Sequence, residues 1–218
     1  MKTHPVDFLL SGACIAVILT AALALVAFVL APLTRAHLGA YHAIADFFLL
    51  LLAYGLLSAL LVRLLLRIRS IDPGECPMDS AVFTHWKLVT VLYRLGQGAL
   101  LPFTSVFAKP LVEMLFGARI GANVALGGTI DDPYMVSIGD GAVLGNASLV
   151  SGNVISNGKV TFGKVTIGKG ATVGANAVVL PGCEVGDGAV VVGGAFVMAG
   201  TKIPAGETWR GNPARKWL

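Results

Sequence analysis

The chain divides into a long apolar N-terminal part and a C-terminal half in which aliphatic residues recur every six positions. Residues 8–30 are apolar throughout and carry no charge, and residues 47–66 form a second apolar run that contains Arg63 near its end. At about 1.5 Å rise per residue, each run can cross a hydrocarbon core about 30 Å thick. We therefore predict a two-helix transmembrane anchor over residues 1–70.

The two apolar runs are joined by a short connector, TRAHLGAYH, so we expect them to form a helical hairpin. Lys2 precedes the first run, and Arg67 and Arg69 follow the second. Because basic residues are enriched on the cytoplasmic side, both termini are expected in the cytoplasm. This predicts a multi-pass protein of the inner (cytoplasmic) membrane. The first run is too long for a signal peptide and lacks a clear cleavage site.

Residues 71–118 contain no apolar run that is long enough to span a membrane, and they show no repeat. Apolar residues recur at helical spacing in residues 80–96 and again in residues 103–117. We predict two amphipathic helices that lie along the membrane surface, with Trp86 and Tyr93 at headgroup depth. The neighbouring His85 is either a catalytic residue or an interfacial one.

From Ile120 onward an aliphatic residue takes the first of every six positions, and Gly often takes the second and fourth. The units read IGANVA, LGGTID, IGDGAV, LGNASL and VSGNVI, then IGKGAT, VGANAV, VLPGCE, VGDGAV, VVGGAF, VMAGTK and IPAGET. A fixed period of this kind is typical of a solenoid. Three such units to a coil predict a triangular all-β solenoid over residues 119–218, with about 4.8 Å between coils. We expect the aliphatic and small positions to point inward and the glycines to form corners that need positive φ.

Two units depart from the repeat and bring polar residues with them. DPYMVS places Asp132 where an inward aliphatic residue belongs, directly after Asp131. The unit that contains Asn153 is followed by a five-residue interruption, residues 156–160. Either these residues form a functional site, or DDP is a turn and SNG a loop with ordinary turn residues.

With three units to a coil, stacking places both irregular units on one face. The unit that starts at Asp132 is expected directly beneath the unit that starts at Val150. If residues 156–160 form a loop that leaves the next corner, the units at Val173 and Val191 return to the same face. Asp140 and Asp187 occupy identical GDGA corners, so we interpret both as turn residues.

The amino-acid composition limits the kinds of binding site that the chain can contain. Only 13% of the residues are charged, and the net charge of +4 forms no basic stripe, which argues against nucleic-acid binding. Cys14, Cys76 and Cys183 lie far apart, so we interpret them as small buried residues in a reducing compartment. The repeats contain no His, which excludes a metal site of the carbonic-anhydrase type and leaves no metal expected.

The repeats and the ending IPAGETWRGNPARKWL resemble the hexapeptide-repeat acyltransferases, whose solenoid is a left-handed parallel β-helix. From about residue 74 the chain is also similar to the membrane-associated transferase-like module at the end of some nonribosomal peptide synthetases. The resemblance implies a homotrimer in which acyl-CoA, with acetyl-CoA expected, lies in the cleft between two chains beneath the loop 156–160. Gly193 and Gly194 would allow the pantetheine arm to approach.

The resemblance also implies basic partners for the coenzyme phosphates, and Lys202, Arg210 and Arg215 are the candidates. A solvated basic end of the chain is the alternative interpretation of those three. In related modules a His stands where this chain has Asn153. Asn can donate a hydrogen bond to an oxyanion but cannot act as a general base.

Three interpretations of the missing base stay open. Asp131 or Asp132 could take the proton, because a paired carboxylate with a raised pKa can act as a base. His85 could reach in from the helix before the solenoid, or the chain could be catalytically silent. We therefore expect a membrane-bound, CoA-dependent acyltransferase that acts on a hydroxyl or amine, with an acceptor that is lipid-linked or delivered at the membrane. The alternative is a trimeric scaffold in a biosynthetic or envelope complex.

Overall fold

A computed structural model describes residues 5–105 and 107–217, which form two compact units. The first, the helical unit, comprises residues 5–70 and Thr84–Thr104. The second, the coil unit, comprises residues 71–83 and 105–217. The chain passes from one unit to the other after Ser70, after Phe83 and after Thr104.

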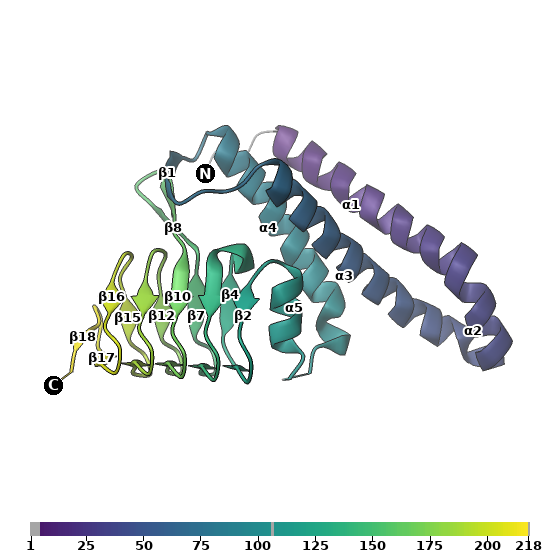
Figure 1. Ribbon diagram of the computed structural model, residues 1–218. Coiled ribbons are helices and arrows are strands. Elements are labelled where there is room, and N and C mark those ends of the chain that lie inside the picture. The colour runs from purple at the N-terminus through teal and green to yellow at the C-terminus, as the bar shows by residue number, and fades with distance from the viewer. Residues whose placement is uncertain (1–4, 106, 218) are drawn as a thin grey trace. The chain divides into compact units, whose positions relative to one another are not determined.

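The coil unit is a parallel β-solenoid of about five coils, as the repeats predict (Figure 1). Its strands form three sheets, which we call faces I, II and III. Face I contains β2 (Arg119–Ile120), β5 (Val136–Ile138), β10 (Val165–Ile167), β13 (Glu184–Val185) and β16 (Lys202–Ile203). Face II contains β3 (Ala125–Leu126), β6 (Val143–Leu144), β11 (Thr172–Val173), β14 (Val190–Val191), β17 (Thr208–Arg210) and β18 (Arg215–Lys216). Face III contains β4 (Thr129–Asp131), β7 (Leu149–Ser151), β12 (Val178–Val179) and β15 (Phe196–Val197).

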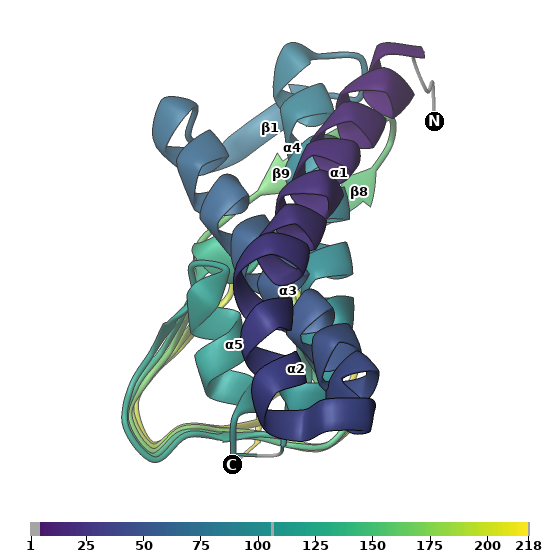
Figure 2. The same cartoon turned by 90° about the vertical axis from the view of Figure 1, so that its right-hand side faces the viewer.

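The first position of each unit points into the coil, and the small fifth position joins it there. Val150, Val179 and Val197 have no exposed surface, and Ala177 and Ala195 fill the adjoining corners with at most 1% exposed. Burying such a Val stabilises the fold by roughly 1.5–3 kcal/mol. Coils superimpose when the unit is viewed end on, because the same positions stack in every coil (Figure 2).

The repeat glycines have two different roles, and only one of them was predicted correctly. Fourth-position glycines such as Gly141 (φ 68°) and Gly170 (φ 63°) adopt the positive φ that the corners need. Second-position glycines do not. A Cβ on Gly145 or Gly186 would lie 2.5 Å from a backbone nitrogen of the next coil. These glycines are there because stacked coils approach each other closely.

The register of face III corrects the expected stacking. Ile130 pairs with Val150, so β4 lies beneath β7 and Asp132 lies at the corner that follows face III. The inward residue Ile130 follows the inward residue Leu126 by four positions, and the next one, Ile138, follows Ile130 by eight. Because a regular unit has six residues, the irregular unit is shifted by two residues. Val173 and Val191 also differ from the expectation: both stack on face II.

The interruption is larger than five residues. It forms a hairpin of β8 (Asn153–Ser156) and β9 (Lys159–Phe162), which leaves the coil at the corner between faces III and I. The N–H of Gly163 donates to the carbonyl of Gly152 at 2.9 Å, which closes the coil beneath the hairpin. β1 (Gly74–Pro77) pairs antiparallel with β9, so the hairpin belongs to a separate three-stranded sheet.

Both ends of the coil carry capping segments. At the start, α5 (Lys109–Leu115) contacts β2 and β3, and Lys109 Nζ donates to the carbonyl of Gly128. At the end, β18 folds back on β17, and Glu207 accepts hydrogen bonds from Trp209 (2.9 Å) and Lys216 (2.7 Å). These bonds hold the pKa of Glu207 below its usual range.

The helical unit begins with a stretch that is helical without a break from Pro5 to Ile68. It comprises α1 (Pro5–Leu25), a π-helical turn (Val26–Leu30), α2 (Ala31–Leu38), a 3₁₀ turn (Gly39–Tyr41) and α3 (His42–Ile68). α1 and α3 lie side by side, and Thr34 Oγ1 donates to Asp46 Oδ1 at 2.6 Å beside the connector. By length and composition the stretch could cross a membrane, which on its own is weak evidence for a span.

The segment after α3 contains two helices, α4 and α5, close to the two places where helices were predicted. α4 (Ala81–Leu100) is a single 20-residue helix followed by a 3₁₀ turn, Leu101–Phe103. Trp86 is 9% exposed and Tyr93 is 1% exposed, so both side chains pack within the protein, and their depth in a membrane stays a prediction. The buried apolar positions of this helix mark protein contacts.

Candidate active site

The candidate site lies at the corner between faces III and I, where the hairpin leaves the coil. Asp132 is the corner residue, with φ 55° and ψ 65°, and it precedes a 3₁₀ turn, Pro133–Met135. Its side chain has no exposed surface. A buried carboxylate is costly unless hydrogen bonds compensate it.

Both oxygens of the Asp132 carboxylate accept hydrogen bonds. Asn153 Nδ2 donates to Oδ2 at 2.6 Å, and the Tyr134 hydroxyl donates to Oδ1 at 3.0 Å. The first donor comes from the hairpin and the second from the turn, so the carboxylate ties the hairpin to the corner. Two donors also favour its ionised form. The structure thus brings together Asp132 and Asn153, as the sequence predicts.

Two glycines make room for this cluster. A Cβ on Gly152 would lie 2.7 Å from Met135 Cβ and 3.1 Å from Asp132 Cβ. A Cβ on Gly117 (φ 108°) would lie 2.9 Å from Tyr134 Cβ. The hairpin can therefore start directly over Asp132, and Tyr134 can lie against the chain after α5.

Asp131 and Ser151 surround the cluster. Asp131 ends β4 opposite Ser151 and is half-buried, whereas Asp132 beside it is fully buried. The two carboxylates thus have different environments. Ser151 Oγ donates to the carbonyl of Asn153 at 2.8 Å and accepts from its N–H at 3.3 Å, which fixes the first residue of the hairpin.

The cluster retains hydrogen-bonding capacity that a substrate could use. An Asn side chain carries two N–H donors, and Asn153 gives one of them to Asp132. A Tyr hydroxyl that donates its proton can still accept one. The arrangement can therefore offer one N–H of Asn153 to a substrate oxygen.

His85 belongs to α4 and has a partner within the helical unit. Its Nε2 lies 3.0 Å from the carbonyl oxygen of Arg69, the residue that caps α3. Burial, more than any other cause, lowers the pKa of this imidazole below its usual range. At neutral pH His85 is accordingly a neutral donor that joins α3 to α4, and its catalytic role stays a prediction.

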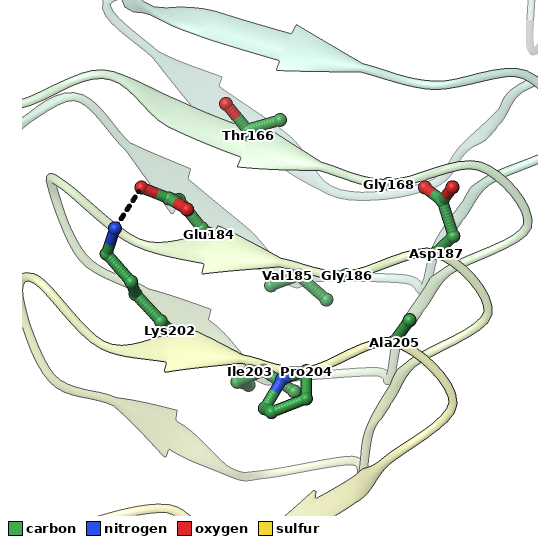
Figure 3. Close-up of a pocket in the computed structure, with 10 residues that line it drawn as sticks. All are labelled: Thr166, Gly168, Glu184, Val185, Gly186, Asp187, Lys202, Ile203, Pro204 and Ala205. Carbon is green, nitrogen blue, oxygen red and sulfur yellow. Dashed lines mark ion pairs between the residues drawn. The ribbon is translucent and has the colours of Figure 1, made fainter.

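The predicted coenzyme ligands do not gather at the Asp132 corner. Gly193 and Gly194 form a corner between faces II and III, and Gly194 has φ 72°. Lys202 points outward from face I and pairs with Glu184 at 2.9 Å beside an open depression (Figure 3). Both side chains are more than half exposed, so this pair contributes little to stability.

The two arginines lie on face II, at the end of the coil. The Cζ of Arg210 lies 4.4 Å from the centre of the Trp217 ring, and Arg215 Nη1 donates to the carbonyl of Ala214 at 2.9 Å. Within one chain, the residues predicted to hold coenzyme A are thus distributed over three sides of the coil. Over residues 5–105 and 107–217, no three His, Cys, Asp or Glu side chains gather as metal ligands would.

The interpretation of the GDGA aspartates is confirmed. Asp140 Oδ1 accepts from the N–H of Ala122 at 2.9 Å, and Asp187 Oδ1 accepts from the N–H of Lys169 at 2.8 Å. Each therefore joins one corner to the corner of the preceding coil. Cys183 is also buried as predicted, whereas Cys14 and Cys76 are half-buried, and all three are free thiols.

Tyr134 and Ser151 were missed by sequence reasoning. Tyr134 lies within the irregular DPYMVS unit, where a phenol two residues after a misplaced Asp was a usable signal. Ser151 occupies a position that reads as an ordinary repeat residue, so nothing in its context marked it.

Comparison with known protein families gives a match for part of the coil unit. Residues 164–204 match the family model described as bacterial transferase hexapeptide (six repeats). This stretch therefore resembles the transferase hexapeptide repeat. It follows the hairpin directly, so Asp132, Tyr134 and Asn153 lie outside the matched residues. Among curated proteins, no sequence matches the chain.

Several solved acetyltransferases are similar in structure. A hexapeptide-repeat-containing acetyltransferase from Vibrio cholerae, complexed with acetyl coenzyme A, is 21% identical with a TM-score of 0.44. The match covers 47% of this chain and 60% of that one, so this chain spans less than two thirds of its length. A galactoside acetyltransferase in complex with coenzyme A is 23% identical, with 53% and 71% covered and a TM-score of 0.44. A maltose O-acetyltransferase from Clostridium difficile 630 is 18% identical, with 67% and 92% covered and a TM-score of 0.41.

Proposed function

We propose that the protein is a membrane-associated acyltransferase that moves an acyl group, acetyl in the first instance, from coenzyme A to a hydroxyl or amine. One observation carries the proposal: in a coil of transferase hexapeptides, a buried carboxylate holds a phenol and an amide at the base of a protruding hairpin. A coil that is regular elsewhere gains no packing from burying Asp132 at this corner.

The cluster supplies a route for the proton in place of the absent His. The acceptor O–H (or N–H) gives its proton to the Tyr134 oxygen while the Tyr134 proton passes to Asp132. The acceptor oxygen (or nitrogen) then forms a bond to the thioester carbonyl carbon, the C–S bond breaks, and the proton held on Asp132 returns through Tyr134 to the leaving thiolate of coenzyme A. The second N–H of Asn153 stabilises the oxyanion that develops on the carbonyl. Asp131, half-buried beside the cluster, is the alternative base.

The distribution of the other predicted ligands favours a homotrimer. Because Gly193, Gly194, Lys202, Arg210 and Arg215 lie away from the Asp132 corner, a second copy must bring such residues to it. The outward positions support contact between copies. On faces II and III most of them are uncharged: Ala125, Val143, Thr172, Val190 and Thr208 on face II, and Thr129, Leu149, Val178 and Phe196 on face III. The charged exceptions in these strands are Asp131 on face III and Arg210, Arg215 and Lys216 at the end of face II. Face I instead presents Arg119, Glu184 and Lys202.

The helical unit supports an acceptor that is lipid-linked or reached at the membrane. Residues 8–30 and 47–66 remain predicted to enter the inner (cytoplasmic) membrane, with the coil unit in the cytoplasm. A small soluble acceptor would need no such attachment. That the coil is left-handed is also a prediction, and it comes from the resemblance to the hexapeptide-repeat acyltransferases.

Calorimetric titration of the purified, detergent-solubilised chain with acetyl-CoA tests the proposal. We expect saturable binding that Tyr134→Phe leaves intact, because the phenol acts on the acceptor and not on the coenzyme. Release of free coenzyme A in the presence of a membrane lipid extract is expected for the native chain and lost in Tyr134→Phe. Absence of any acetyl-CoA binding would refute the proposal.

A non-enzymatic trimeric scaffold is the second candidate, because no His follows His85 in the sequence. In that case the Asp132 cluster only anchors the hairpin, whose outer surface would then be the part that binds other proteins. A chain that assembles normally and binds no acyl-CoA would favour this function.

A further inference from the structure

The way α4 joins the two units limits how the helical unit can meet a membrane. Residues 71–83, before the body of α4, belong to the coil unit, and so do residues 105–217 after it. Both ends of this helix therefore lead into the same compact body.

α4 runs antiparallel to α3 over most of its length. Near one end, His85 bonds to Arg69 at 3.0 Å; further along, Leu100 lies directly against Gly55. Beyond the helix, the rings of Phe103 and Phe48 are 6.2 Å apart. The stretch of α3 between these contacts runs from Phe48 to its end at Ile68, about 30 Å at 1.5 Å per residue, which equals the thickness of a hydrocarbon core.

α1 is tied to the same end of the bundle. Lys87 of α4 forms an ion pair with Asp7 in the first turn of α1, and both side chains are about 10% exposed (11% and 10%). An ion pair this well buried is held in place because separating it would leave an uncompensated charge. The N-terminal ends of α1 and α4 therefore lie together, at the end of the bundle where α3 ends.

An upright hairpin would place the two ends of α4 on opposite sides of the bilayer. The coil unit would then have to lie on both sides. β1 pairs residue for residue with β9, from Gly74 with Phe162 to Pro77 with Lys159, while α5 contacts β2 and β3. All of these elements belong to the coil unit, whose face I carries exposed charged residues, and such a body cannot lie within hydrocarbon.

We infer that the helical unit lies flat in a single leaflet, with α1 and α3 parallel to the membrane plane, and does not cross the bilayer. This inference rests on the proposed membrane association and not on acyl transfer. It places both ends of α4, the N-terminal end of α1 and the connector after α2 on the same side of the membrane.

The exposed side chains fit one leaflet. Large apolar residues remain exposed along the whole length of α1 and α3: Phe8, Leu9, Val17, Leu19 and Leu23 on α1, and Ile44, Phe47, Leu56, Leu60 and Leu64 on α3. Exposed basic residues stand at both ends of the hairpin, with Arg35 at the connector and Arg67 and Arg69 at the end of α3. A helix that lies in the interface can direct such side chains to anionic headgroups at both of its ends.

Cysteine labelling in oriented membrane vesicles tests the inference. In a full-length background with Cys14→Ala, Cys76→Ser and Cys183→Ala, one variant carries Ala40→Cys in the connector and another carries Asp79→Cys before α4. Both positions are exposed. A membrane-impermeant maleimide is added to right-side-out and to inverted vesicles. We expect both cysteines to be labelled in vesicles of the same orientation, and neither to be labelled in vesicles of the opposite orientation.

Labelling of Ala40→Cys only from the side opposite to Asp79→Cys, or only after detergent, would show a spanning hairpin and overturn the inference. Recovery of the chain in the soluble fraction would also overturn it and would indicate that further copies cover the apolar faces. Acetyl-CoA binding is measured on the same preparations, so loss of the membrane geometry is distinguished from loss of the proposed activity.

Depth measurement gives a second readout. In chains whose native tryptophans are replaced by Phe, Phe8→Trp reports on the end of α1 and Leu56→Trp on the middle of α3. If the helices lie flat, lipids brominated at one shallow position quench both tryptophans equally. Strong quenching of Leu56→Trp by bromines near the bilayer centre, with Phe8→Trp unaffected, would contradict the flat arrangement.

Discussion

The side-chain amide of Asn153 donates a 2.6 Å hydrogen bond to Oδ2 of Asp132, a carboxylate with no exposed surface. The hairpin thus begins with a residue that satisfies a buried charge of the coil. Removing Asn153 takes this donor from Oδ2 of the buried carboxylate, and removing the carboxylate takes this acceptor from the Asn153 amide. The hairpin, the corner and the proposed chemistry therefore depend on the same pair.

Asp132→Asn is expected to abolish turnover and to lower the free energy of unfolding by about 1–3 kcal/mol, because an amide must now face two donors. Urea denaturation followed by circular dichroism and release of coenzyme A measure the two effects. Asp140→Asn is the matched control, since Asp140 accepts a single backbone N–H and is exposed. Equal stability and equal rates in the two variants would show that the buried carboxylate is dispensable.

Tyr134→Phe tests the proton relay separately from stability. It removes one hydrogen bond, so we expect a loss of at most about 1.5 kcal/mol in unfolding free energy. Turnover should fall by about 10²–10⁴-fold, which is the usual contribution of general acid–base catalysis. Tyr41→Phe, at an exposed tyrosine of the connector, is the control and should change neither quantity.

Asp131→Asn decides between the two carboxylates. If Asp132 acts through Tyr134, replacing Asp131 leaves most of the turnover. If the rate instead falls with Asp131→Asn and persists with Tyr134→Phe, Asp131 is the base and the relay is wrong. Unchanged rates in Asp131→Asn and in Asp132→Asn together would exclude a carboxylate mechanism altogether.

The fold could be predicted because the six-residue repeat follows directly from which side chains pack inside the coil. An aliphatic residue every six positions has one efficient arrangement, with Val150, Val179 and Val197 stacked inside a three-sided coil. The exact register could not be predicted at the irregular corner. The sequence does not show that face III begins two residues early, at Ile130, because Gly128 and Thr129 are compatible with either alignment.

The site was predicted in part for a similar reason. A charged residue in place of an inward aliphatic one marks Asp132, and the interruption marks Asn153. The clamp of β1 on β9 depends on contacts between segments far apart in sequence, such as Cys76 with Val160. Tyr134, in contrast, lies only two residues from Asp132 and could have been noticed. An amphipathic pattern does not distinguish a lipid surface from a protein surface, so the sequence could not show that Trp86 and Tyr93 are buried within the protein.

Gly152→Ala is expected to displace the hairpin. The new methyl group would meet Met135 at 2.7 Å, closer than a real Cβ contact, so the corner or the hairpin must move. We expect a loss of about 1–3 kcal/mol from overpacking and faster amide exchange in residues 153–162, measured by mass spectrometry. Gly98→Ala is the control, since a methyl group there meets nothing within 4 Å and favours the helix. Unchanged exchange in the hairpin would show that the corner has more room than the contacts indicate.

His85 should make the packing of α4 on α3 sensitive to pH. Its pKa is lowered from the usual 6.5, mainly by burial, so the undocked state binds protons more readily than the docked one. The stabilisation is therefore fully present above about pH 6.5 and is lost as the pH falls through the lower pKa of the docked state. Thermal unfolding of the solubilised chain should show a melting temperature that rises between about pH 5 and pH 7.5. His85→Gln keeps a donor for the carbonyl of Arg69 and should remove this dependence, whereas His37→Gln, at an exposed position, should preserve it. A pH profile that His85→Gln leaves unchanged would mean that another group controls the contact.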